Sequence, residues 1–135
     1  MNPNGGQALV ELALCAPVVI LLALGATAVV QVQDAGAGLD AATHAAASAA
    51  TRAPDPVSAN AAAHARFGAL VAAYPLGGAT LRISVGTFGR ASTVTATSEA
   101  FVEVGWSGLA VSHRINLRSR AITRVEPWRT HRAPV

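Results

Sequence analysis

The sequence predicts an α+β fold, with a long N-terminal membrane helix, a second helix and a small three-stranded antiparallel sheet. Three observations support this prediction. Residues 12–30 form an apolar run without a charge, residues 67–74 repeat apolar side chains at helical spacing, and residues 81–125 alternate apolar and polar side chains. In a chain of 135 residues, a membrane helix leaves about a hundred residues for one small domain.

The apolar run from Leu12 to Val30 is long enough to cross a membrane. As a helix that rises about 1.5 Å per residue, it covers about 28 Å, close to the thickness of a bilayer's hydrocarbon core. Pro17 lies inside the run and removes one backbone hydrogen bond, so a kink is expected there. Glu11 lies at the start of the run, where an ionised carboxylate is costly unless it has a partner.

The flanks of the run set its expected orientation. Residues 1–6 contain no Lys or Arg, so the positive-inside rule orients the helix only weakly. The α-amino group supplies the positive charge before the run, whereas Asp34 and Asp40 follow it. We therefore expect the N-terminus inside the cell and a C-terminal domain outside the cytoplasm.

The first helix is expected to continue beyond the membrane to about Thr51. Gly36 and Gly38 each cost about 1 kcal/mol relative to Ala in a helix interior, so they are expected to loosen the helix. The Ala-rich residues 45–50 favour a helix that packs closely against the domain or against other helices. The sequence Ala53-Pro54-Asp55-Pro56 then breaks the helix.

A second helix is predicted from Pro56 to about Ala73. Asp55 is the expected N-cap, and Pro56 suits the first turn of a helix, where a backbone N–H has no intrahelical partner. Apolar side chains then recur at helical spacing. The expected buried stripe consists of Phe67, Leu70, Val71 and Tyr74.

The remaining residues alternate with the period of a β-sheet and are predicted to form three strands, with residues 105–108 as a hairpin connection. One face of this sheet is expected to lie on the helices. Its side chains are Leu81, Ile83 and Val85 in the first strand, Val94, Ala96, Ala100, Val102, Val104 and Trp106 in the second, and Ile115, Leu117, Ala121 and Val125 in the third.

The basic residues of the chain are all arginines, and most of them follow residue 89. Such a cluster could indicate nucleic-acid binding. Glu99 and Glu103 share the outer sheet face with four of the arginines, so cross-strand ion pairs on a solvated strand face explain the pattern better. These arginines are Arg114, Arg118, Arg120 and Arg124. We therefore expect no nucleic-acid partner.

No motif for catalysis, phosphate binding or metal binding is present in the sequence. His44 and His64 lie in predicted helices without Cys, Asp or His at ligand spacing, so no metal site is expected. The single cysteine, Cys15, excludes a disulfide within the chain and is expected to be a small packing residue. The chain is therefore not expected to be an enzyme or to bind a cofactor.

The N-terminal residues carry a family resemblance. Gly6-Gln7-Ala8-Leu9-Val10-Glu11, followed by Leu12-Ala13-Leu14-Cys15-Ala16-Pro17, resembles the N-terminus of the TadE-like minor pilins. These proteins belong to the tight-adherence (Flp) branch of type IV pili. In that family a prepilin peptidase cuts after the glycine, and the fifth mature residue is glutamate. The resemblance implies a cut after Gly6 that leaves Gln7 first and Glu11 fifth.

Physical chemistry gives a reason for this glycine and this glutamate. A peptidase at the membrane face needs an extended, unhindered segment to cut, which Gly5 and Gly6 can supply. The carboxylate of Glu11 needs a positive partner in lipid, and the new α-amine of Gln7 in a neighbouring subunit would serve. Either charge alone in a low dielectric costs several kcal/mol, so the pair would set the axial register of packed helices.

The expected organisation is a leader (1–6), a transmembrane and extended helix (7–53), a small extracytoplasmic α+β domain (54–127) and a basic tail (128–135). The implied function is a structural and assembly role in a Flp-type pilus. The implied partners are other pilin-like subunits, the pilus assembly machinery, the prepilin peptidase and the lipid bilayer.

Two alternatives remain open. The first is an unprocessed single-pass membrane protein whose extracytoplasmic domain binds a partner. The second is a secreted protein, because Ala26-Thr27-Ala28 and Ala35-Gly36-Ala37 are typical of signal-peptidase sites. The first residue of the mature protein distinguishes the three hypotheses, since it would be Gln7, Met1, or a residue after Ala28 or Ala37.

Overall fold

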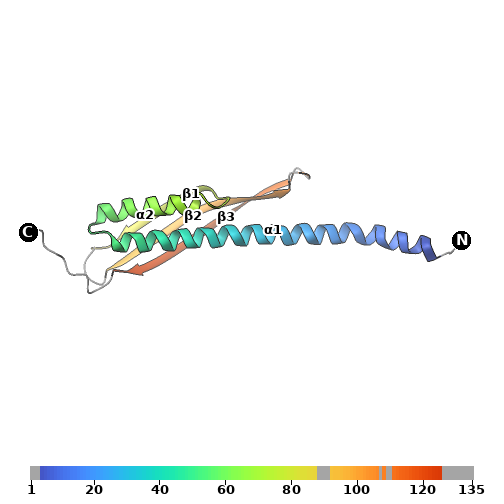
Figure 1. Cartoon of the computed structure of the whole chain (residues 1–135), viewed down its shortest axis with the longest axis horizontal. Helices are drawn as coiled ribbons and strands as arrows, with labels where there is room; N and C mark the ends of the chain where they lie inside the picture. The colour runs from blue at the N-terminus through green and yellow to red at the C-terminus, as the bar shows by residue number, and fades with distance from the viewer. Residues whose placement is uncertain (1–3, 88–91, 107, 109–110, 126–135) are drawn as a thin grey trace, which may run out of the picture.

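The computed structural model describes residues 4–87, 92–106, 108 and 111–125. Two helices lie on one face of a three-stranded antiparallel sheet with strand order β1-β2-β3 (Figure 1). The elements in chain order are α1 (Asn4–Arg52), α2 (Pro56–Val71), β1 (Gly77–Val85), β2 (Thr93–Trp106) and β3 (Val111–Arg124). The α+β prediction, with its long first helix and its three strands, is confirmed.

Helix α1 is one continuous element of 49 residues. Its N-terminal half projects beyond the rest of the molecule, and its C-terminal half lies beside α2 and against β2 and β3 (Figure 1). The helix runs without a break through Pro17 and ends at Arg52, one residue after the expected end. A single rigid element therefore links the predicted membrane segment to the domain.

The expectation that Gly36 and Gly38 loosen α1 is wrong, because the helix is continuous through both residues. Gly38 is buried, and the ring of Tyr74 lies where a side chain at this position would be. A Cβ built on Gly38 would lie 2.5 Å from the nearest ring atoms, whereas Gly36 has nothing within 4 Å. Gly38 thus allows the ring of Tyr74, which follows α2, to approach the backbone of α1. This packing offsets the low helix propensity of glycine.

Alanines make up ten of the fifteen buried residues of the main core between the helices and the sheet. Six of the alanines in the main core belong to the end of α1 or to α2 and are fully buried: Ala42, Ala46, Ala47, Ala50, Ala59 and Ala63. Alanine loses no side-chain entropy on burial and adds little bulk, so these elements can pack closely without large hydrophobic residues. The Ala-rich segment that was predicted to pack against the domain does so.

Helix α2 begins as predicted, with Asp55 as its N-cap. The Asp55 carboxylate accepts hydrogen bonds from the backbone N–H groups of Val57 and Ser58, both at 2.9 Å, and from the Ser58 hydroxyl at 2.7 Å. The bonds donated by Ser58 are the main cause of a lowered pKa of the Asp55 carboxyl, whose ordinary value is 3.8. The helix ends at Val71, two residues before the expected Ala73. Its buried residues are Ala59, Ala63 and Phe67, and the other three residues of the expected stripe are partly buried.

The sheet has the predicted inner face, with two buried serines, Ser98 and Ser119, that the apolar pattern did not reveal. Ser98 interrupts the apolar side of β2, yet it is completely buried. Its hydroxyl shares a hydrogen bond with the hydroxyl of Thr43 on α1, and Thr43 also donates to the carbonyl of Leu39 at 2.7 Å. Because both hydroxyls have partners, the pair joins α1 to the sheet without leaving a polar group unsatisfied.

The predicted cross-strand ion pairs are confirmed on the outer face. Arg114 Nη2 lies 2.9 Å from Glu103 Oε1, and Arg118 Nε lies 3.1 Å from Glu99 Oε1. In both pairs the two residues lie directly opposite in the β2–β3 register. These side chains are exposed, so each pair contributes little to stability and mainly keeps the arginines solvated and paired. The basic tail (128–135) and part of the predicted hairpin connection lie outside the described residues.

The contact between Gly38 and Tyr74 makes a testable prediction. Gly38→Ala should lower the free energy of unfolding by about 1–3 kcal/mol relative to Gly36→Ala, because only the first variant forces the ring to move. Both substitutions add the same methyl group to α1, so the helix-propensity gain is common to both. Thermal unfolding in detergent micelles, followed by circular dichroism, measures the difference. Equal melting temperatures for the two variants would contradict the packing role of Gly38.

Candidate functional site

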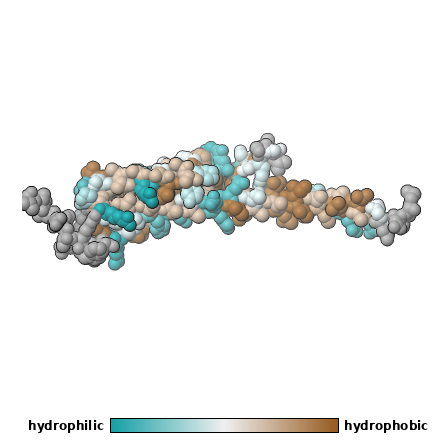
Figure 2. Space-filling model, viewed as in Figure 1, coloured by the Kyte–Doolittle hydropathy of each residue, from teal (hydrophilic) through white to brown (hydrophobic). Residues whose placement is uncertain are grey.

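The N-terminal half of α1 is an exposed apolar surface, here called the shaft (residues 5–23). Its large side chains are between 56% and 70% exposed, and Figure 2 shows hydrophobic residues along this part of the helix. They are Leu9, Val10, Leu12, Leu14, Val18, Val19, Ile20, Leu21 and Leu22. By length and composition α1 can cross a membrane. An apolar surface of this size needs lipid or protein to cover it.

The shaft ends where the domain begins to cover α1. Leu24 and Ala28 are half-buried, and Ala35 is completely buried in a cluster with Val102 and Val104 of β2. At the end of β2, the indole N–H of Trp106 donates to the hydroxyl of Thr27 at 3.2 Å. The domain of the chain thus covers α1 from about Leu24 onward and leaves the shaft bare.

The predicted processing and assembly residues lie on the shaft, away from the domain. Gly6, Gln7 and Glu11 are all exposed on the shaft, and Gln7 and Glu11 are one helical turn apart on the same side of α1. Glu11 forms no ion pair with any residue that the structure describes. The expected ends of the membrane run, Leu12 and Val30, are 66% and 63% exposed.

The glycines before Gln7 are helical, although cleavage would need an extended segment. Gly5 and Gly6 lie in the first turn of α1, which begins at Asn4. The first N–H groups of a helix have no intrahelical partner, and glycine is among the weakest helix formers. Unwinding this turn is therefore inexpensive, and no domain residue lies within 4 Å of a Cβ built on either glycine.

Cys15 was expected to be a packing residue, but it is exposed on the shaft. His44 and His64 are exposed on α1 and α2. Within the described residues, no group of three or more His, Cys, Asp or Glu side chains could hold a metal ion. Cys15, His44 and His64 therefore do not indicate a metal site in the described part of the chain.

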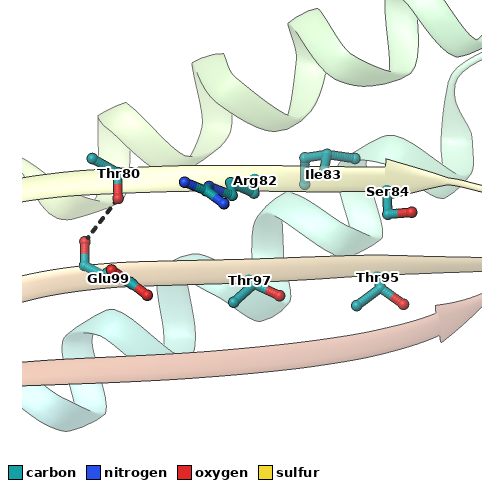
Figure 3. Close-up of a pocket in the computed structure, with 7 residues that line it drawn as sticks. All are labelled: Thr80, Arg82, Ile83, Ser84, Thr95, Thr97 and Glu99. Carbon is teal, nitrogen blue, oxygen red and sulfur yellow. Dashed lines mark hydrogen bonds between the residues drawn. The ribbon is translucent and has the colours of Figure 1, made fainter.

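A shallow recess of about 280 Å³ lies on the outer face of the sheet (Figure 3). Four of its seven lining residues carry a hydroxyl group, and Thr80 donates to the backbone carbonyl of Glu99 at 3.5 Å. The Glu99 carboxylate is already paired with Arg118, so it is not poised as a base. The full lining is Thr80, Arg82, Ile83, Ser84, Thr95, Thr97 and Glu99. This recess has no nucleophile with an activating partner.

The contact between Trp106 and Thr27 was not predicted from the sequence. Trp106 was predicted on the apolar side of its strand, but its hydrogen bond to Thr27 was not. The two residues are 79 positions apart in the sequence, and the apolar alternation fixes a face and not a contact along the helix axis. An aromatic residue with a polar N–H at a strand end was the available signal.

Comparisons with curated proteins and with solved structures give no match. The family model described as TadE-like protein matches residues 6–48. This range begins at the glycine of the predicted processing site and covers α1 to within four residues of its end. It includes the whole of the shaft from Gly6 and most of the part that packs on the sheet. Over its N-terminal helix the chain is therefore similar to TadE-like proteins.

Proposed function

We propose that the chain is a minor pilin, or pseudopilin, that acts as a structural and assembly component of a Flp-type type IV pilus. The observation that carries this proposal is the division of α1 into a bare apolar shaft and a half that its own domain covers. A helix of this kind can exchange lipid for the apolar helices of other subunits. The TadE-like match over the same helix supports the proposal.

The first environment of the shaft is the bilayer. In this proposal α1 crosses the cytoplasmic membrane once, with residues 54–127 outside the cytoplasm. The first arginine after the shaft is Arg52, beyond its immediate flank, so the side that would lie outside the cytoplasm carries no basic residue close to the membrane, in agreement with the positive-inside rule. The domain contacts begin only at about Leu24, so the domain leaves most of the shaft free to lie in lipid.

Cleavage between Gly6 and Gln7 by a prepilin peptidase removes the leader in this proposal. The new α-amine of Gln7 then lies one turn from Glu11 along the shaft. A carboxylate without a partner is costly in lipid, and the amine of a neighbouring subunit can neutralise it. The pair between subunits would fix how far one helix slides along the next, because any other register separates the two charges.

The packing of α1 disfavours the secreted alternative. Signal-peptidase cleavage after Ala37 would remove Ala35 from its cluster with Val102 and Val104. Cleavage after Ala28 would remove Thr27 and its bond to Trp106. Both cuts would take away parts of the helix that the sheet covers.

The N-terminal sequence of the membrane-extracted protein tests processing. With the cognate prepilin peptidase present, we expect a mature protein that begins at Gln7, and without it a protein that begins at Met1. Gly6→Leu should block the cut, because a bulky side chain obstructs the scissile segment. Gly25→Leu, at an equally open position on the same helix, should be cut normally. A start at Met1 in both wild-type samples would instead support the unprocessed membrane-anchored binding domain.

Charge removal at Glu11 tests the proposed pairing. Glu11→Gln should lower incorporation into pili by about tenfold or more, since it leaves the α-amine of Gln7 without a partner in a low dielectric, which costs several kcal/mol. Asp34→Asn removes one charge from the same helix at an exposed position beyond the apolar run, and it should assemble normally. Quantitative immunoblots of sheared pili and of membranes separate assembly from expression. Equal incorporation of both variants would refute a role for Glu11 in register.

A further inference from the structure

The end of the β2–β3 hairpin at which β2 leads into β3 lies beside α1 at the level of Thr27. We define the hairpin end by its described residues, which are Gly105, Trp106, Gly108, Val111 and Ser112. Trp106 pairs with Val111 across the two strands and donates its indole N–H to Thr27. In Figure 1 these strands extend along α1 toward its N-terminus, beyond the end of α2. We propose that the hairpin end rests in the headgroup layer of the bilayer, with Trp106 as its interfacial anchor.

The length of the apolar segment places the hairpin end at the membrane surface. The segment from Ala8 to Ala26 covers about 28 Å as a helix, close to the hydrocarbon thickness, and it ends next to Thr27. If the hydrocarbon core instead covers Leu12 to Val30, its outer boundary lies about 5 Å beyond Thr27. Both placements put the level of Trp106 within about 5 Å of the boundary.

The chemistry of the hairpin end suits this layer. Its described residues carry no charge, and Val111 is 55% exposed. Tryptophan is enriched where membranes meet water, because its ring is apolar and its N–H is polar. The half-buried ring of Trp106 has its N–H satisfied by Thr27, so contact with lipid leaves no polar atom without a partner.

The nearest charges are arranged to stay outside the hydrocarbon. Glu103 and Arg114 neutralise each other at 2.9 Å, and the Arg114 guanidinium also lies over the ring of Phe101, 4.0 Å from its centroid. They lie three residues from the ends of their strands, about 10 Å back from the hairpin end. His113, between this pair and Val111, is exposed and can donate to a lipid phosphate.

The two tryptophans of the chain allow a depth measurement on the full-length protein. Trp128→Phe keeps Trp106 as the single reporter and leaves the hairpin end unchanged. In phosphatidylcholine vesicles, lipids brominated close to the headgroup should quench Trp106 at least twofold more than lipids brominated close to the chain end. Trp106→Phe, which keeps Trp128, is the control. In the sequence Trp128 has the charged residues Glu126 and Arg129 close to it, and these disfavour contact with lipid, so it should be quenched at least twofold less than Trp106.

Three results would overturn the inference: no quenching of Trp106, stronger quenching from the chain end, or equal quenching of Trp106 and Trp128. Cys15 reports the membrane span separately, because it is the single thiol and lies on the shaft. Protection of Cys15 from a membrane-impermeant maleimide, together with an unquenched Trp106, would reject the hairpin contact and keep the span. The inference depends on insertion of α1 and not on leader cleavage or pilus assembly, so Cys15 labelling in intact vesicles would overturn it as well.

Discussion

A single helix that carries more apolar surface than its own domain can cover is the constraint on which the rest of this structure depends. From about Leu24 to Arg52 the sheet and α2 cover one side of α1, and before Leu24 nothing in the described chain does. Water is a poor solvent for the bare shaft, so its stable environments are lipid and other apolar helices. The same helix links both environments to the domain without a hinge, because α1 is continuous. In the proposed assembly, membrane insertion, the position of the hairpin end and packing between subunits are therefore geometrically coupled.

The domain itself is held to α1 by small residues and not by a large hydrophobic core. Alanines of both helices fill the contact, Gly38 admits the ring of Tyr74, and the hydroxyls of Thr43 and Ser98 satisfy each other inside it. Small side chains permit close approach but supply little buried area each, so the fit between elements matters more than the bulk of any residue. A domain of this kind can remain slender along α1, as Figure 1 shows, and leave room for neighbouring helices around the shaft.

Local patterns predicted most of the fold. The N-cap at Asp55, the alternation in three strands and the ion pairs of Glu99 and Glu103 each depend on spacing along the chain or between adjacent strands. The contacts that join distant elements were not predictable in this way. In the sequence Ser98 is a polar interruption of an apolar strand face, and only the structure shows its hydrogen bond with Thr43. Gly38 is a weak helix former in the sequence, and only the structure shows that the ring of Tyr74 packs against it. The sequence predicts the shaft as part of an apolar run, but it does not predict how much of the run the domain leaves uncovered. That limit is set by the contact of Trp106 with Thr27.

The central claim is that other pilin-like subunits cover the shaft in the assembled state. A photo-crosslinking residue at Leu14, which is 70% exposed, measures this most directly when compared with one at Val57 on α2, which is 80% exposed. The account predicts that Leu14 yields adducts with pilin-like subunits in sheared pili and that Val57 yields at least several-fold fewer. Adducts of Leu14 with lipid alone, or equal protein adducts at both positions, would contradict it.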